Sequence, residues 1–210
     1  MAAWINDALG WVADYPELAL AGAFIAAIIE AVAIVGTIIP GTFIVMGIAG
    51  AAAAAGQPML PYLAVATLGA VLGDYLSYWL GYRFRFSIQQ WRVFTARPQM
   101  LASAERFFEK YGSYSVAFCR FIPVLRSTVP MVAGIAGMSR RKFLVANVAS
   151  AFVWAPAHVF PAQLAGLSID RLREGDWKMA ALMGAGVAAC AVGVWLLHRC
   201  ISPLLVTARR

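Results

Sequence analysis

Long apolar stretches dominate the chain and alternate with short segments that are basic or rich in glycine. A membrane-spanning helix needs about 20 mostly apolar residues, and four stretches meet that requirement: 18–36, 61–80, 143–165 and 179–199. The chain is 62% hydrophobic and only 13% charged, which is about half the charged fraction of an ordinary soluble domain. We therefore predict an all-helical polytopic membrane protein with about four full transmembrane helices.

Two further apolar stretches, 36–58 and 112–137, contain too many helix breakers to be ordinary spans. Backbone N–H and C=O groups freed by such breakers cannot face lipid, because they would have no hydrogen-bond partners there. We therefore predict two re-entrant hairpins packed inside the protein, with a kinked helix pair that crosses fully as the alternative. The residues expected to shape these hairpins are Pro40, Gly41, Pro123, Pro130 and Gly134.

The N-terminal residues 1–17 differ from the stretches that follow them. They place Ile5, Leu9 and Val12 at helical spacing, which is typical of a helix lying in the membrane interface. They do not resemble a signal peptide, because no Lys or Arg precedes Arg83. The expected domains are the interfacial helix at 1–17, a transmembrane domain at 18–165, and an outer loop, last span and cytoplasmic tail at 166–210.

Basic residues are distributed unevenly among the loops. The segment 81–112, expected to form central interfacial amphipathic helices, holds six of them, the turn at 140–142 holds three, and the tail from residue 199 holds three more. Only three lie in the loop at 166–178. Lys and Arg favour the cytoplasmic side, so we predict that the first three segments and both termini are cytoplasmic. The first hairpin then opens outward and the second inward, as in transporters built from inverted repeats.

Four ionisable side chains remain inside apolar sequence: Glu30, Asp74, Arg120 and Arg126. Each costs roughly 2.5–3.5 kcal/mol at the centre of a membrane helix, so we expect them to be paired, hydrated or neutralised. One interpretation is a structural ion-pair cluster that locks the hairpins. The other is a transport site in which Arg120 and Arg126 bind a phosphate while Glu30 and Asp74 exchange protons. An alternative for Asp74 is a pair with the basic residues that end its own span.

These residues, in this order, resemble the DedA family of the wider SNARE-associated (VTT-domain) membrane proteins. The resemblance covers about residues 18–165, and its most specific part is the Arg-Phe-x-Pro-x-x-Arg stretch at 120–126 followed by Ala133-Gly134. The other matching pieces are Glu30, Pro40-Gly41, Gly73-Asp74, Tyr78, Gly81, the stretch 107–112, Met138, Phe143, Asn147 and Trp154.

The resemblance implies a lipid transporter of the bacterial inner membrane. Some members of the family return undecaprenyl phosphate to the cytoplasmic leaflet, and others are associated with movement of phospholipids. Carried over residue by residue, Glu30, Arg120 and Arg126 match the membrane charges that are essential in the family. Many members have an acid where this chain has Thr42. A hydroxyl can donate a hydrogen bond to a phosphate, but it cannot take up and release a proton near neutral pH as a carboxyl group can.

We therefore expect a flippase for undecaprenyl phosphate or a related anionic lipid phosphate, with coupling to the proton-motive force left open by Thr42. The alternatives are an uncoupled scramblase of phospholipids such as phosphatidylethanolamine, and a proton-coupled carrier of a small solute. The expected partners are membrane lipids and protons, and the small residues around Gly184 and Gly186 leave open either a homodimer or packing within the monomer.

Other classes of function fit the sequence poorly. The net charge of +7 is explained by the loops, and no basic groove with stacking aromatics indicates nucleic acid. We expect no enzyme, because no nucleophile–base pair and no phosphate-binding glycine-rich loop is recognisable. The three cysteines have no paired spacing and the two histidines are far apart, so neither a metal nor a cofactor is predicted.

Overall fold

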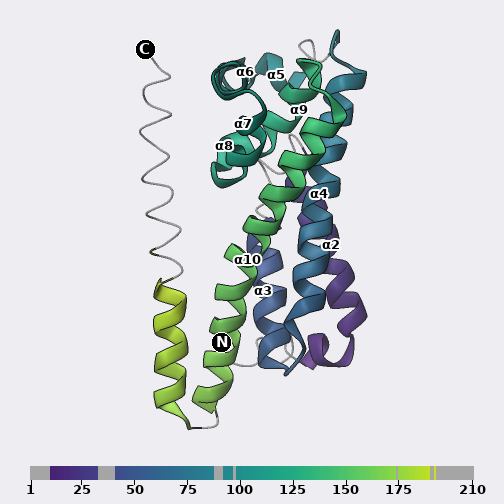
Figure 1. The fold of residues 1–210 in the computed structure, drawn as a ribbon. Coiled ribbons are helices and arrows are strands. Elements are labelled where there is room, and N and C mark those ends of the chain that lie inside the picture. The colour runs from purple at the N-terminus through teal and green to yellow at the C-terminus, as the bar shows by residue number, and fades with distance from the viewer. Residues whose placement is uncertain are drawn as a thin grey trace.

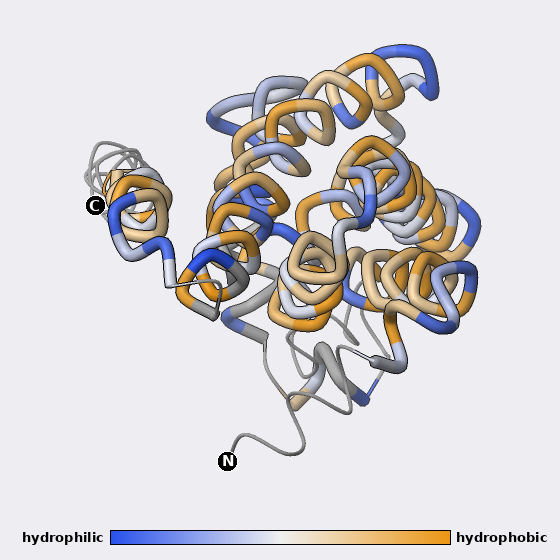
Figure 2. The backbone as a smooth tube through the Cα atoms, turned by 90° about the horizontal axis from the view of Figure 1, so that it is seen from below, coloured by the Kyte–Doolittle hydropathy of each residue, from blue (hydrophilic) through white to orange (hydrophobic). Residues whose placement is uncertain are grey.

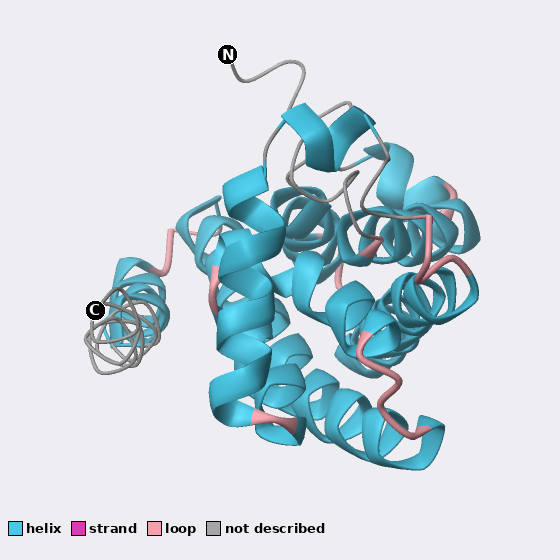
Figure 3. Cartoon of the chain, turned by 90° about the horizontal axis from the view of Figure 1, so that it is seen from above, coloured by secondary structure: helices cyan, strands magenta, loops and turns pink. Residues whose placement is uncertain are grey.

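The computed structural model describes residues 10–32, 41–87, 92–96, 98–173, 175–189 and 192. The regular structure in this part of the chain is helical throughout, and it contains no strand (Figure 3). The predicted all-helical fold is therefore confirmed. The helices form one bundle, with a further helix at 177–189 lying beside the end of the longest one (Figure 1).

Two helices in the described region are long and apolar enough to cross a membrane. They are α4 (Met59–Arg83) and α10 (Arg140–Arg173), whose apolar part runs over Arg140–Ile169. At 1.5 Å per residue, the 25 residues of α4 extend about 37 Å, which exceeds the hydrocarbon thickness of about 30 Å. These helices contain the predicted spans 61–80 and 143–165 and lie side by side in the bundle (Figure 1).

Two shorter helices pack along this central pair. The helix α2 (Pro16–Ala31) starts with proline in its first turn, where the missing N–H is harmless, and it packs on α4. The helix α3 (Gly41–Ala54) packs mainly on α10 and also on α2. The described part of the predicted hairpin 36–58 is thus one helix and the turn that follows it, whereas 36–40, including Pro40, lie outside the described residues.

Glycines allow these helices to approach at backbone distance. A Cβ atom at Gly73 of α4 would lie 2.6 Å from the Ile28 carbonyl oxygen of α2. One at Gly166 of α10 would lie only 1.9 Å from the Gly50 carbonyl oxygen of α3. Small residues of this kind are what allow helices to associate in lipid, where close packing replaces the hydrophobic effect.

The stretch that connects α4 to α10 is a series of short helices gathered at one end of the bundle (Figure 1). In chain order they are α5 (Arg92–Ala96), α6 (Pro98–Tyr111), α7 (Ser113–Phe118), the 3-10 helix η3 (Cys119–Phe121), α8 (Pro123–Arg126) and α9 (Thr128–Ile135). Helix α6 is strongly amphipathic, with Phe107 buried and Lys110 exposed. This pattern agrees with the central interfacial helix predicted there.

The predicted breakers in 112–137 act in different ways. The chain leaves the helical conformation at Ile122, immediately before Pro123, because a residue that precedes proline disfavours the helical region. Pro130, by contrast, does not interrupt a helix. It lies in the first turn of α9, where its missing N–H removes no hydrogen bond. The glycine at 134 is a packing residue, since a Cβ atom there would lie 2.1 Å from the Tyr78 carbonyl oxygen of α4.

The interior of the bundle consists largely of small residues, while large apolar side chains face outward. Alanines of α2, α3 and α4 are almost fully buried, including Ala19, Ala27, Ala52 and Ala66. By contrast, Phe43, Leu60, Val145, Phe152 and Leu182 are more than half exposed, and apolar positions lie on the outer sides of many helices (Figure 2). A surface of this kind is suited to lipid rather than to water.

The two ends of the predicted architecture are described only in part. Residues 1–9 of the N-terminal interfacial helix lie outside the described region, and at 10–14 the chain is helical. Val12 is buried there, and its carbonyl oxygen accepts a hydrogen bond from Gln57 at 2.7 Å. The predicted last span is described as a helix at 177–189, and the remaining residues of that span, apart from residue 192, lie outside the description.

Candidate functional site

The four ionisable side chains predicted inside apolar sequence come together as two ion pairs. Arg126 Nη1 lies 2.7 Å from Glu30 Oε1, and Arg120 Nη2 contacts Asp74 Oδ2. Glu30, Asp74 and Arg120 are each no more than 5% exposed. The predicted mutual pairing is therefore observed, and the alternative partners for Asp74, the basic residues that end its span, do not take that role. Pairing of this kind offsets the large free-energy cost of burying isolated charges.

The broken backbone between η3 and α8 lets both arginines reach the same region. On one continuous helix, residues 120 and 126 would lie about 9 Å apart along the axis and about 120° apart around it. The extended conformation of Ile122 interrupts that helix. Arg120 then meets Asp74 in the middle of α4, while Arg126 reaches Glu30 near the end of α2.

Both guanidinium groups lie over the ring of Trp154, which comes from α10. The ring centroid is 5.9 Å from Arg120 Cζ and 5.1 Å from Arg126 Cζ. Cation–π contacts of this kind are strongest where water is excluded, and Trp154 is only 1% exposed. Trp154 is part of the family resemblance, but no role was predicted for it. Its position in the middle of an apolar span, away from the interface, is the signal that could have identified it.

The second ion pair extends into a polar link between three helices. Arg120 Nη2 also donates a hydrogen bond to Asn147 Oδ1 at 2.5 Å. The Asn147 amide nitrogen in turn donates to the backbone carbonyl of Val71 in α4 at 3.0 Å. Asn147 therefore orients the Arg120 side chain relative to both α4 and α10. From the sequence, this residue could be selected only by its polarity within a span and its place in the family resemblance.

Thr42, predicted to bind substrate, lies beside the first ion pair. Its hydroxyl donates to Glu30 Oε1 and accepts a hydrogen bond from Arg126 Nη1 at 3.1 Å. The neighbouring Gly41 makes this position accessible, because a Cβ atom there would lie 2.6 Å from the Ala26 carbonyl oxygen and 2.7 Å from Glu30 Cβ. Gly41 therefore allows α3 to pack closely against α2, and this packing brings Thr42 into contact with the Glu30 carboxylate.

Several polar atoms in this cluster have no hydrogen-bond partner within the described residues. They include Nε and Nη1 of Arg120, Nε1 of Trp154 and Oε2 of Glu30, all of them buried. Buried donors without partners are costly, and two unused N–H-bearing nitrogens on one buried arginine are suited to an anionic ligand. In the same part of the chain, no group of three or more His, Cys, Asp and Glu side chains is arranged to hold a metal ion.

His158 and Cys119 lie next to the cluster without joining it. The ring centroid of His158 is 4.8 Å from that of Trp154, and its Nδ1 lies 2.8 Å from the Trp154 carbonyl oxygen one helical turn earlier. Cys119 is fully buried and directly precedes Arg120, and its thiol donates to the Val116 carbonyl oxygen. Both contacts are local to their own segment, so these residues support the backbone around the arginines.

Comparison with known proteins places the chain in a family. Residues 39–164 match the VTT domain. Inner membrane protein YabI of Escherichia coli is 31% identical over 177 residues, which cover 82% of this chain and 68% of YabI. Protein DedA of E. coli is 34% identical over 90 residues, or 41% of this chain and 40% of DedA.

A Lactococcus lactis protein named alkaline phosphatase-like is 31% identical over 123 residues, covering 55% of this chain and 54% of that protein. No solved structure matches the chain. The match to the VTT domain spans more than half of the sequence. It includes three of the four charged residues of the site, Asp74, Arg120 and Arg126, and begins after Glu30. Together with the similarity to YabI, it shows that the chain belongs to the VTT-domain (DedA) family of membrane proteins.

Proposed function

We propose that this protein is a flippase that moves an anionic lipid phosphate between the leaflets of the bacterial inner membrane, with undecaprenyl phosphate as the first candidate. The observation that carries the proposal is the buried Arg120, two of whose N–H-bearing nitrogens have no partner among the described residues. A second, largely buried arginine, Arg126, lies over the same tryptophan ring. Arginine suits this role because it keeps its charge when desolvated and its planar fork matches phosphate oxygens.

Phosphate binding would proceed by exchange of partners. A phosphate oxygen that accepts from the free nitrogens of Arg120 competes with Asp74 and Asn147 for the same guanidinium. Arg126 is engaged in the same way with Glu30 and Thr42. A carboxylate displaced from its arginine is left buried without a counter-charge, which favours its protonation. Glu30 and Asp74 are therefore the proposed proton-coupling residues.

The lengths of the helices support the proposed membrane arrangement. Helix α3 has 14 residues and would extend only about 21 Å, which is too short to cross the hydrocarbon layer. The pieces α7, α8 and α9 are shorter still. We propose that α3, and the segment from α7 to α9, form parts of two oppositely directed re-entrant hairpins within an inverted repeat. Both termini would be cytoplasmic, as the distribution of basic residues predicts.

An uncoupled phospholipid scramblase is the second candidate, and Thr42 favours it. Thr42 contacts Glu30 and Arg126 directly, so an acid at that position would be part of the charge cluster. With a hydroxyl there, the cluster contains one proton-carrying group fewer. Transport that is insensitive to a proton gradient would support this candidate, whereas uptake of a water-soluble anion would support a carrier of small solutes.

The name of the Lactococcus relative raises hydrolysis of a phosphate ester as a further candidate. The hydroxyl of Thr42 does contact the Glu30 carboxylate, a pairing that sequence analysis did not identify. The same carboxylate oxygen also accepts from Arg126 at 2.7 Å, which makes it a weak base. We therefore retain transport as the function and treat recognition of phosphate as the property that both candidates share.

Translocation of undecaprenyl phosphate in proteoliposomes, with and without an inward proton gradient, tests the proposal. We expect Arg120→Ala and the milder Arg120→Gln to abolish movement while the protein remains folded. The control Arg141→Gln removes the same charge from an exposed position at the start of α10 and should have little effect. A folded Arg120→Ala protein that moves the lipid normally would overturn the site. A folded wild-type protein that does not move this lipid would remove it as the substrate.

The oligomeric state stays a prediction. Gly184 has open space beside it, whereas a Cβ atom at Gly186 would contact Leu164 of α10 at 3.4 Å. One face of the helix at 177–189 thus packs within the monomer, and Gly184 is free for a partner chain. Cross-linking of a cysteine at position 184 in membranes would detect a homodimer.

A further inference from the structure

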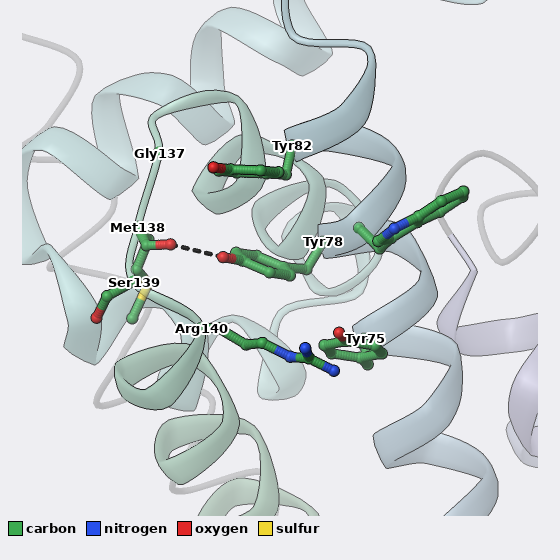
Figure 4. Close-up of a pocket in the computed structure, with 8 residues that line it drawn as sticks. Tyr75, Tyr78, Tyr82, Gly137, Met138, Ser139 and Arg140 are labelled. Carbon is green, nitrogen blue, oxygen red and sulfur yellow. Dashed lines mark hydrogen bonds between the residues drawn. The ribbon is translucent and has the colours of Figure 1, made fainter.

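A cavity lies apart from the ion pairs, between α4 and the turn that begins α10. Its volume is about 350 Å³. One wall carries the tyrosines Tyr75, Tyr78 and Tyr82 of α4, and the other is formed by residues 137–140 (Figure 4). The proposed transport site uses none of these residues.

The turn at 137–139 is held rigidly against α4. The hydroxyl of Tyr78 donates to the Met138 carbonyl oxygen at 2.6 Å, and its ring stacks on Phe143 with centroids 4.3 Å apart. Gly137 adopts a φ of +71°, which L side chains rarely reach. The wall of the cavity formed by this turn is therefore held in place by contacts of the fold itself.

The free polar groups of the cavity are donors. Arg140 Cζ lies 5.0 Å from the ring centroid of Tyr75, and the side chain extends along the tyrosine wall (Figure 4). Within the described residues, no carboxylate pairs with Arg140, and the hydroxyls of Tyr82 and Ser139 have no hydrogen-bond partner there. A cation accompanied by two hydroxyls is suited to a phosphate group.

We propose that this cavity binds the phosphate headgroup of a membrane lipid. The phosphate group is chemistry shared by lipid headgroups and inorganic phosphate, but the aromatic wall favours a ligand with an apolar portion. The side chains of Trp79 and Tyr82, which also line the cavity, are each about half exposed, and such aromatics are typical of the membrane–water interface.

The place of the cavity relative to the ion pairs gives it a role. Both sites are lined by α4 and α10. Along α4, Tyr82 lies eight residues beyond Asp74, and along α10, Arg140 precedes Asn147 by seven. These separations correspond to about 10–12 Å along each helix. The cavity is thus a peripheral site for the lipid phosphate about two helical turns from the central arginines, on the side predicted to be cytoplasmic, and this role as a step in transport rests on the proposed function.

Titration calorimetry on the purified full-length protein in detergent, with dihexanoyl phosphatidic acid as the probe, tests the site. We expect Arg140→Gln to weaken binding about tenfold, because a hydrogen bond to a charged group is lost. The matched control is Arg141→Gln, which removes the same charge next to the cavity but does not line it. This control should change the affinity less than twofold. Dihexanoyl phosphatidylcholine, a phosphodiester with a cationic headgroup, should not distinguish the two variants.

Equal weakening by the two substitutions would show general attraction to the basic turn and would overturn the site. Displacement of the probe by inorganic phosphate at the same concentration would overturn the assignment to a lipid. Thermal unfolding of each variant checks folding, which the exposed position of Arg140 should preserve. If wild type fails to translocate lipid but Arg140-specific binding remains, the proposed function fails and the site stands. If wild type translocates lipid and Arg140→Gln binds the probe normally, the proposed cavity site is wrong and the proposed function stands.

Discussion

Glu30 and Arg126 lie 96 positions apart in the sequence, yet Arg126 Nη1 approaches Glu30 Oε1 to 2.7 Å. The contact joins the end of α2 to the last residue of α8. It therefore ties the first predicted span, which contains Glu30, to the second predicted hairpin, which contains Arg126.

Removing one partner of this pair should destabilise the protein strongly. Glu30→Gln or Arg126→Gln leaves a buried charge without its counter-charge, which costs roughly 3–5 kcal/mol in comparable cases. The double substitution removes both charges, and we expect it to recover most of the thermal stability in detergent. If the pair also serves transport, the double variant stays inactive in proteoliposomes. Recovery of transport together with stability would show that the pair is only structural.

Trp154 should be needed for more than its volume. Trp154→Phe keeps an aromatic face for Arg120 and Arg126, whereas Trp154→Leu removes it. A cation–π contact contributes about 0.5–2 kcal/mol, so we expect the leucine variant to lose transport more severely than the phenylalanine variant. Initial rates of lipid translocation measure the difference. As a control, the equally large exposed Trp177 should tolerate substitution by leucine, and equal rates for the two Trp154 variants would contradict a role for the aromatic face.

An acid at position 42 should change the response to a proton gradient. Thr42 contacts both Glu30 and Arg126, so Thr42→Asp introduces a carboxyl group that competes for the same guanidinium. We expect transport by this variant to depend more strongly on an inward proton gradient than transport by the wild type. Thr42→Val, which has a similar shape but no hydroxyl, should not gain this dependence. A gradient response that is the same in all three proteins would exclude position 42 from coupling.

The contact between α3 and α10 should not tolerate even one added methyl group. At Gly166, a Cβ atom would lie 1.9 Å from the Gly50 carbonyl oxygen, so Gly166→Ala forces the two helices apart. We expect a fall of several degrees in the thermal unfolding temperature. The matched control is Gly47→Ala in α3, which has open space around its Cβ position and should be neutral or slightly stabilising. Equal melting temperatures for the two variants would contradict the packing.

The sequence predicted the long elements and the charged residues because each depends on local composition. A run of about 20 apolar residues defines a helix such as α4 or α10 without knowledge of its neighbours. Likewise, a charge inside such a run can be predicted to have a partner even when the sequence does not show which residue the partner is. The family resemblance was carried by the same residues, and the similarity to YabI and the VTT domain confirms it.

The pairing of these charges and the roles of the prolines could not be predicted in the same way. Two acids and two arginines allow two sets of pairs. Which set forms depends on where the fold places Arg120 and Arg126 on either side of the backbone break at Ile122. Pro130 was expected to help shape the second hairpin because proline breaks helices, but the effect of a proline depends on where the helix begins. The convergence on Trp154 depends on three separate elements, and no local pattern encodes it.

The two ion pairs set a charge balance for any ligand that enters between them. Two carboxylates and two guanidiniums sum to zero, and a phosphate monoester brings a charge of about −1.5 to −2 near neutral pH. Since net charge is costly in a low-dielectric interior, a bound monoester would require close to two compensating protons. Glu30 and Asp74 are two carboxyl groups in contact with the arginines. The number of protons taken up for each lipid moved should therefore approach two for a monoester and fall to about one for a phosphodiester, which carries a single negative charge.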